Sequence, residues 1–341
     1  MNNELLKVFI IDEPFPYAEM EILGYPLREH LKRSLCELEP VIVGCSQKMS
    51  ETAAQYTAVL YSDMPLITAP LLYDLIDYME RQGHNSLSVG RGYICKSSLV
   101  NKADLKISFD SEECISALTP DRLSDVYRVL SRRNIKKAID GGALILDPTA
   151  IFIDMDAVIE SGAVIHPMVT IKGRSVIKSG ALIRSGSVIE NSIIGRNVSV
   201  FASFIYDSEI GENTTVGPCS LIRGGSEIGS NVRIGDFVEI KASKLGDGCK
   251  AAHLTYIGDA ELGVSVNVGC GTVFANYNGK IKQKTYVGDH AFIGSNTNLV
   301  APLKVGNYAY TAAGSTVTED VPDNTLCIAR ARQVIKERKD K

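Results

Sequence analysis

The chain of 341 residues has no tryptophan, little net charge and no long apolar run. Its formal net charge of -4 argues against general binding to nucleic acid, because the phosphate backbone attracts strongly basic surfaces. No stretch approaches the roughly 18 consecutive apolar residues of a membrane-spanning helix, and the first residues lack the features of a signal peptide. We therefore expect a cytoplasmic protein that has neither nucleic acid nor a membrane as a partner.

The eight cysteines are scattered, with no C-x-x-C pair and no His/Cys cluster at the spacing of zinc ligands. We interpret them as reduced thiols and predict no metal site. Hydrophobic residues make up 45% of the chain and charged residues 22%, which is typical of folded globular proteins and too apolar for intrinsic disorder. The length favours two domains, or one domain with a repeat array.

Glycine is scarce at first and frequent later, since only five of the 29 glycines lie within residues 1–140. Short apolar runs alternate there with helical patterns, which predicts an α/β domain. Thr119 and Pro120 are suited to begin a helix and Gly141 and Gly142 to end it. The predicted organisation is a small α/β domain (1–118), a linker helix (119–142), a β domain (143–320) and a C-terminal tail (321–341).

From Ile153 an aliphatic residue recurs about every six positions, and 25 of 28 such positions are isoleucine, leucine or valine. Strands of a sandwich would alternate with period two instead. The repeat predicts a hexapeptide parallel β-helix of about nine coils, in which three units make one coil and the repeated residues stack inside. The series is Ile153, Ile159, Ile165, Ile171, Ile177, Ile183, Ile189, Ile194, Val200, Ile205, Ile210, Val216, Ile222, Ile228, Ile234, Ile240, Leu245, Ala251, Ile257, Leu262, Val268, Phe274, Val287, Ile293, Leu299, Val305, Thr311 and Val317.

The flat faces of such a rod commonly pack side by side, so we expect a homo-oligomer. The spacing alone does not give the handedness of the helix. The repeats specify a scaffold rather than an activity, and function is therefore sought where the pattern is broken.

The repeat is broken at Ala251, where a large aliphatic residue is expected, and by an inserted loop over residues 276–284. One coil is about 18 residues, so His253 and Asn276 are about one turn apart and their side chains are expected to share a cleft. The loop carries three lysines at alternating positions, which suits binding of phosphate groups. A solvated charged loop and an incidental surface histidine are the alternative interpretation.

The stretches HLTYIGDAELG, ANYNGKIKQKT, IGSNTNLVAP and AAGSTVTEDVP lie within residues 217–330. This region resembles the C-terminal domain of the bacterial bifunctional N-acetylglucosamine-1-phosphate uridyltransferase/glucosamine-1-phosphate acetyltransferase family. The resemblance implies a left-handed β-helix, a homotrimer with active sites between subunits, and acetyl transfer from acetyl-CoA to the amine of glucosamine-1-phosphate. No metal is needed for that step.

The same resemblance implies residue roles. His253 would be the general base, since imidazole titrates near neutral pH, and Glu239 a nearby acidic partner. Arg223 and Lys241 would hold the sugar phosphate, whereas Lys282 would neutralise a coenzyme phosphate. The sugar would be hydrogen-bonded by Tyr256 and Asn267, and the acetyl-CoA groove would be lined by Cys270, Asn276, Tyr277, Ser295, Ala313 and Arg330.

The N-terminal part departs from that family. The family's glycine-rich L-A-A-G-x-G-T-x-M loop is missing, and residues 8–16 read VFIIDEPFP, with acidic residues where phosphate would lie. The YGDVPL motif survives as residues 61–66, but no second metal ligand accompanies Asp63. Because phosphoryl transfer depends on positioning and metal charge, we expect a trimmed domain without uridyltransferase activity. A structural role, a regulatory role or a weak nucleotide pocket remain open for it.

Two further interpretations stay open for the whole chain. In the first, the chain is an acetyltransferase whose acceptor is a different amino-sugar phosphate or a nucleotide-linked amino sugar, because Arg223 and Lys241 do not identify the sugar. In the other the chain is a non-enzymatic paralogue that binds a nucleotide sugar or a partner protein.

Overall fold

The computed structural model of this chain describes residues 4–45, 47–50, 52–102, 104–105 and 107–337. The chain forms two compact units, Met1–Arg133 and Asn134–Lys341. The boundary between them lies inside helix α3 (Pro120–Asp140), which falls within the expected linker segment. The finer division into four parts stays a prediction.

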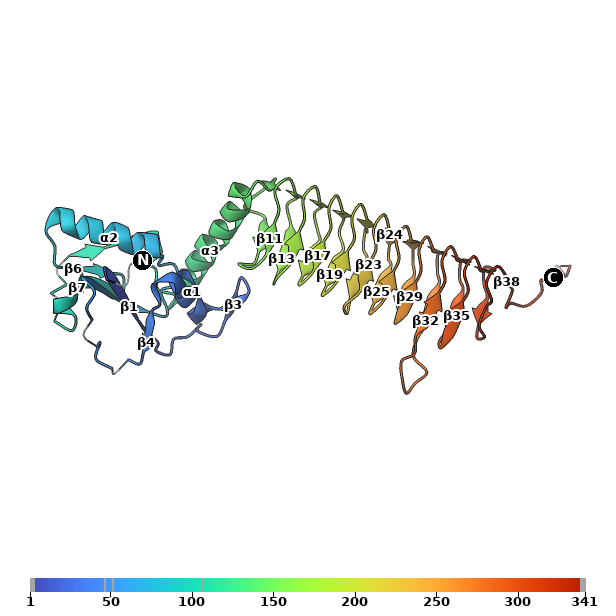
Figure 1. The fold of residues 1–341 in the computed structure, drawn as a ribbon, viewed down its shortest axis with the longest axis horizontal. Helices are drawn as coiled ribbons and strands as arrows, with labels where there is room; N and C mark the ends of the chain where they lie inside the picture. Colours follow the sequence, from blue (N-terminus) through green and yellow to red (C-terminus); the bar gives the residue numbers. More distant parts are fainter. Residues whose placement is uncertain (1–3, 46, 51, 103, 106, 338–341) are drawn as a thin grey trace. The chain divides into compact units, whose positions relative to one another are not determined.

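The first unit is an α/β structure on a mixed six-stranded sheet of order β4–β1–β5–β7–β6–β8 (Figure 1). Its strands are β1 (Leu6–Ile11), β4 (Val41–Val43), β5 (Tyr56–Tyr61), β6 (Ser86–Val89), β7 (Gly92–Lys96) and β8 (Ser108–Phe109), beside a hairpin of β2 (Glu21–Ile22) and β3 (Tyr25–Pro26). Its helices are α1 (Leu27–Ser34) and α2 (Ala69–Gln82), with short 3₁₀ turns at Cys36–Leu38, Ser97–Leu99 and Glu112–Cys114. Strands β1, β4 and β5 are mutually parallel, so their carboxyl ends meet at one sheet edge.

Strand β1 is buried on both faces, because successive side chains of a strand point to opposite sides of the sheet. Val8 and Ile10 belong to a core that includes Leu72 of α2. Phe9 and Ile11 belong to a smaller core. The near-continuous apolar run is thus explained by a sheet that is covered on both sides.

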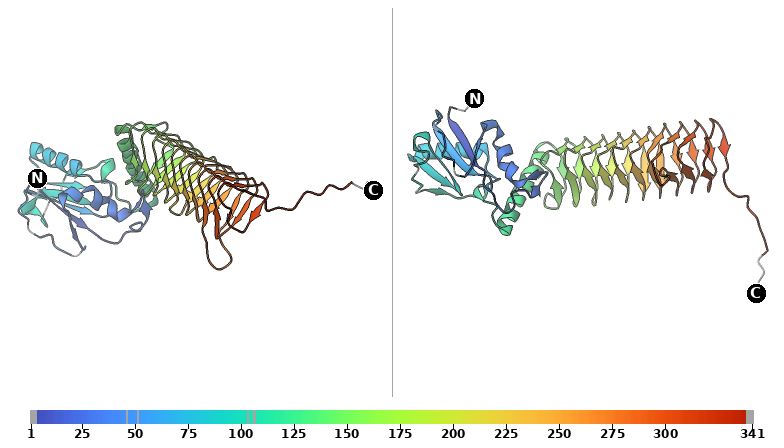
Figure 2. Two further views of the ribbon diagram at one scale, coloured as in Figure 1. Left: turned by 45° about the vertical axis from the view of Figure 1, so that its right-hand side comes forward. Right: turned by 90° about the horizontal axis from the view of Figure 1, so that it is seen from below.

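The second unit is a parallel β-helix whose short strands form three sheets (Figures 1 and 2). The β10–β37 sheet contains β10 (Ile151–Ile153), β13 (Val169–Lys172), β16 (Val188–Glu190), β19 (Phe204–Tyr206), β22 (Leu221–Arg223), β25 (Glu239–Lys241), β28 (Tyr256–Gly258), β31 (Val273–Ala275), β34 (Asn298–Val300) and β37 (Thr316–Val317). The β11–β35 sheet contains β11 (Val158–Ile159), β14 (Val176–Ile177), β17 (Ile193–Ile194), β20 (Glu209–Ile210), β23 (Glu227–Ile228), β26 (Lys244–Leu245), β29 (Ala260–Leu262), β32 (Thr285–Val287) and β35 (Leu303–Val305). The β9–β38 sheet contains β9 (Leu144–Ile145), β12 (Val164–Ile165), β15 (Leu182–Ile183), β18 (Ser199–Val200), β21 (Thr215–Val216), β24 (Arg233–Asp236), β27 (Lys250–His253), β30 (Asn267–Val268), β33 (Phe292–Ile293), β36 (Tyr310–Thr311) and β38 (Leu326–Cys327).

Strands β10 to β36 make nine coils of three strands each, which confirms the β-helix expected from the sixfold spacing. The fold is the left-handed hexapeptide-repeat form. Each strand pairs in register with the strand one coil away, so Ile222 lies opposite Ile240, and Ile240 opposite Ile257.

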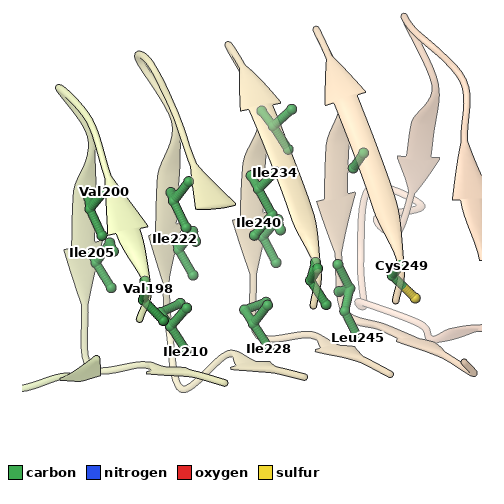
Figure 3. Close-up of a cluster of buried hydrophobic side chains, with 14 of the residues drawn as sticks. Val198, Val200, Ile205, Ile210, Ile222, Ile228, Ile234, Ile240, Leu245 and Cys249 are labelled. Carbon is green, nitrogen blue, oxygen red and sulfur yellow. The ribbon is translucent and has the colours of Figure 1, made fainter. Parts of the chain in front are cut away.

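All 28 positions of the sixfold series are buried, including Ala251 and Thr311. Figure 3 shows part of this stack, with Ile205, Ile222 and Ile240 in successive coils. Each buried isoleucine contributes about 1.5–3 kcal/mol of transfer free energy, and the stack repeats this gain at every coil. Ala251 faces inward between Ile234 and Val268, so the small side chain does not turn its strand away from the core.

Gly235 is required where β24 and β27 come together. A Cβ at this position would lie 1.8 Å from the carbonyl oxygen of Ala252, so any side chain would push the two coils apart. The next residue, Asp236, lies opposite His253 in the register of the two strands. The glycine therefore allows these two polar residues to lie close together.

Candidate active site

Four of the expected site residues lie on the outer face of the β10–β37 sheet. Ile222, Ile240 and Ile257 point into the core, so the side chains before and after them point outward. This places Arg223 of β22, Glu239 and Lys241 of β25, and Tyr256 of β28 on one surface, with Arg223 opposite Lys241 and Glu239 opposite Tyr256. We call this surface the β22–β28 face.

Arg223 and Glu239 form an ion pair on this face. The Arg223 Nε and Nη2 atoms lie 3.1 and 2.6 Å from Glu239 Oε1. The two side chains are 41% and 35% exposed, so the pair contributes little to stability and serves mainly to orient the guanidinium. The carboxylate expected beside His253 is thus engaged by Arg223.

Lys241 and Lys282 lie side by side although both are cations. Lys282 comes from the inserted loop between β31 and β32, which Figure 1 shows extending from the stacked strands. The Lys241 ammonium lowers the pKa of Lys282, first because it can donate a hydrogen bond to the neutral amine and then because it repels the charged form, while Asp259 and Tyr256 act in the opposite direction. Two adjacent ammonium groups are stabilised by an anion bound between them.

Asn276 links the loop to the β22–β28 face. Its Nδ2 atom donates to the Tyr256 hydroxyl at 3.4 Å and also to the Asp259 carboxylate. The side chain is buried, and the exposed Tyr277 that follows pairs with Lys282 across the loop. The loop is therefore a hairpin anchored beside Tyr256.

His253 ends β27 and precedes Tyr256 by three residues, so it lies at the corner where the chain enters the β22–β28 face. Its Nδ1 atom is 2.5 Å from Oδ1 of Asp236 at the end of β24. The hydrogen bond with His253, and then one from its own backbone N–H, lowers the pKa of Asp236. Sequence reasoning missed Asp236, although its offset of 17 residues from His253 is one coil.

Three residues expected in the acetyl-CoA groove continue the row that begins at His253. The register of β27, β30, β33 and β36 places Cys270, Ser295 and Ala313 one, two and three coils beyond His253. All three are exposed. Arg330 approaches the end of this row, since a Cβ on Gly314 would lie 3.7 Å from its Cδ atom.

Asn267 is the expected site residue that the structure separates from the others. It begins β30 and points outward from the β9–β38 sheet, whereas Tyr256 points outward from the β10–β37 sheet. Within one chain the two side chains therefore belong to different faces.

In the first unit, a second polar cluster lies where the parallel strands end. Asp63 follows β5, and its carboxylate is 1% exposed and lies 3.0 Å from Arg91 Nη1. Arg91 also pairs with Glu13, which follows β1, and its guanidinium lies 4.4 Å from the centre of the Tyr61 ring. Carboxylates thus stand beside a guanidinium at the edge where α/β sheets commonly bind ligands.

Within the described part of the chain, no group of three or more His, Cys, Asp or Glu residues could hold a metal ion. Across the same residues, no helix has both the length and the apolar character needed to cross a membrane.

The chain is similar to several known proteins. Residues 148–244 match the family model of the GMPPB C-terminal domain. The bifunctional protein GlmU of Clostridium acetobutylicum is 49% identical over 231 residues, which are 68% of this chain and 51% of that protein. GlmU of Acetivibrio thermocellus is 43% identical over 270 residues, 77% of this chain and 58% of that protein. Both matches are longer than the β-helix unit, so they reach into the first unit.

Among solved structures, the UDP-N-acetylglucosamine acyltransferase of Francisella novicida matches with a TM-score of 0.40 and 22% identity. That match covers 55% of this chain and 67% of the other. The chain spans about half the length of the GlmU proteins that it matches. With identities of 43–49% to those proteins, the chain belongs to the GlmU family.

Proposed function

We propose that the β-helix unit is an N-acetyltransferase that moves the acetyl group of acetyl-CoA to the amine of glucosamine-1-phosphate. The observation that carries this proposal is the arrangement around Tyr256. His253, which is paired with Asp236, lies three residues before Tyr256. Asn276 of the inserted loop donates to the Tyr256 hydroxyl, and Lys282 of the same loop lies against Lys241. The face thus offers a base and an anion-binding site to one small acceptor.

The acceptor's phosphate binds to Arg223, Lys241 and Lys282. Arg223 is oriented by Glu239, and an anion between the two lysines relieves the repulsion that lowers the pKa of Lys282. The contact with Lys241 supports placing Lys282 on the sugar phosphate rather than on the coenzyme phosphate suggested by the sequence.

Acetyl transfer needs only a base and a well-placed thioester. The acceptor nitrogen attacks the thioester carbon, and the imidazole of His253 takes the amine proton as the C–N bond forms. The tetrahedral oxyanion then collapses, the C–S bond breaks, and the proton on His253 passes to the coenzyme thiolate. Cys270, Ser295, Ala313 and Arg330 form the row along which acetyl-CoA lies, with donors near Ser295 available to the oxyanion.

The assembly that this site requires is a homotrimer. Asn267 and Tyr256 face outward from different sheets of one chain, and both can contact one sugar only where the faces of two subunits meet. The separation of these two residues thus supports an active site between subunits.

The first unit lacks uridyltransferase activity in this proposal. Asp12 and Glu13 follow β1, where a phosphate-binding loop would lie, and the Asp63 carboxylate is already paired with Arg91. Negative charge at this edge repels nucleotide phosphates. Incubation with UTP, N-acetylglucosamine-1-phosphate and Mg²⁺ should release no pyrophosphate, and measurable release would overturn this part.

The test of acetyl transfer follows coenzyme thiol release from acetyl-CoA with glucosamine-1-phosphate, glucosamine-6-phosphate or glucosamine. Of the three amines, we expect only glucosamine-1-phosphate to give robust thiol release. Blanks that contain the protein without an amine correct for the signal of exposed cysteines such as Cys36. Release with a different amino sugar would replace glucosamine-1-phosphate as the proposed acceptor. No release with any amine would overturn the proposal.

A further inference from the structure

We propose that Asp236 is a positioning residue that fixes the tautomer of His253, so that Nδ1 carries the proton and Nε2 presents its lone pair to the acceptor. This inference rests on the proposed function, in which His253 is the base. Neither the repeat pattern nor the resemblance to a known family had singled out Asp236.

The geometry selects Asp236 and not Glu239 as the partner of His253. The Asp236 Oδ1 atom lies 2.5 Å from His253 Nδ1. Glu239 instead accepts two N–H groups of Arg223 through Oε1. Of the two carboxylates in the D-F-V-E segment, Asp236 therefore orients the imidazole of His253 and Glu239 orients the guanidinium of Arg223.

The backbone holds the His253–Asp236 pair from both sides. The N–H of Leu254 donates to the carbonyl oxygen of Asp236 at 2.9 Å, and the Thr255 hydroxyl donates to the carbonyl oxygen of His253 at 2.8 Å. Gly235 permits the close approach of the two coils. The distance between the side chains is thus set by the stacking of β24 on β27.

The charge of Asp236 decides the direction of the hydrogen bond. The bond to His253 lowers the pKa of Asp236, and the cation of Arg233 on the same strand acts in the same direction. An ionised carboxylate has acceptors only, so Nδ1 must be the donor in the neutral imidazole. The lone pair is then left on Nε2, the atom that a base at this corner must present.

Three substitutions separate this role from a structural one. In Asp236→Asn the amide oxygen can keep the hydrogen bond from the residue's own backbone N–H, which turns the amide nitrogen, a donor, toward Nδ1. This stabilises the opposite tautomer and should lower kcat about 100-fold. Asp236→Ala leaves the ring free to adopt either tautomer and should lower kcat only about tenfold. Asp236→Glu keeps a carboxylate as the hydrogen-bond acceptor of Nδ1–H and should retain most of the activity of the unmodified protein.

The order of these variants is diagnostic. A structural role would make the isosteric Asn variant milder than the Ala variant, whereas tautomer control makes it worse. Asp247→Asn is the matched control, because Asp247 accepts a backbone N–H from Ser230 at 2.7 Å and an amide oxygen can do the same. It should leave kcat unchanged.

A measurement without substrate keeps the inference separate from the proposed function. The ¹⁵N chemical shifts of the His253 ring, assigned with His253→Gln, should show protonated Nδ1 in the unmodified protein and protonated Nε2 in Asp236→Asn. The same tautomer in both proteins, or an Asn variant as active as the Ala variant, would overturn the role of Asp236. Absence of acetyl transfer alongside the expected ¹⁵N shifts would overturn the acetyltransferase and leave the pair intact.

Discussion

In the first unit the guanidinium of Arg91 lies between the carboxylates of Glu13 and Asp63, whereas in the second unit the ammonium of Lys282 lies against that of Lys241. The first cluster neutralises its own cation and has no need of an added anion. The second cluster holds two like charges together, and a bound anion would relieve their repulsion. This difference favours an anion site on the β-helix unit and agrees with the proposal that the first unit lacks uridyltransferase activity.

The two units also differ in how their cores are specified. The β-helix repeats one apolar position along the whole stack, whereas the first unit uses two small clusters on opposite faces of one sheet. A local break in the stack is therefore expected to disturb the coils on either side of it. A local break in the first unit should stay within that unit.

The largest effect should come from Ile228→Asp, which breaks the β-helix side of this comparison. Ile228 is 4% exposed and lies between Ile210 and Leu245, so the variant buries an unpaired charge in the stack. We expect loss of the folded unit, measured by circular dichroism and solubility. Glu227→Ala changes the exposed neighbouring residue and is the control. A soluble Ile228→Asp protein with an unchanged melting temperature would contradict the register.

The next effect concerns chemistry and not folding. His253→Ala should lower kcat for acetyl transfer by roughly 10²–10⁴, with the melting temperature unchanged because the side chain is 52% exposed. His290→Ala, at another exposed histidine of the same unit, is the matched control and should keep full activity. Equal turnover in the two variants would remove His253 from the mechanism.

A weaker effect is expected from Arg91→Ala, which tests the self-neutralised cluster. The variant leaves Asp63 buried without its cation and should lower the stability of the first unit by about 1–3 kcal/mol, because Arg91 itself is partly exposed. Hydrogen exchange should rise in β5 and β7, with acetyl transfer within twofold of the unmodified protein. Adding Asp63→Asn should reverse the change. Faster exchange in the β-helix would show that the units are coupled.

The smallest effect compares two buried thiols, one in each unit. Burial raises the pKa of Cys95 and that of Cys249 to about 11, so iodoacetamide at pH 8 should modify both far more slowly than the exposed Cys270. Cys249 lies in the middle of the stack, so we expect Cys95 to react a few-fold faster. Peptide mass spectrometry measures both rates. Faster labelling of Cys249 would contradict the expectation that its place in the stack protects it better than Cys95 is protected.

The β-helix could be predicted from the sequence because its order is local. One apolar residue in every six suffices to place a strand and its inward side, and the structure buries even the exceptions Ala251 and Thr311. The inserted loop was visible for the same reason, as an interruption of a regular count. The first unit offered only alternating helical and apolar patterns, since its β7 and β8 pairings depend on long-range contacts.

The sequence by itself thus determined the stacked coils, the inserted loop and the position of His253 outside the core, two residues after the repeat position Ala251. Only the tertiary structure decided which side chains face each other: Asp236 for His253, Glu239 for Arg223, and Lys241 for Lys282. These partners belong to different coils, and the coil from Asp236 to His253 is 17 residues where the regular repeat gives 18. A single-residue slip changes every neighbour across the coils, so partners are fixed only once the coils are stacked.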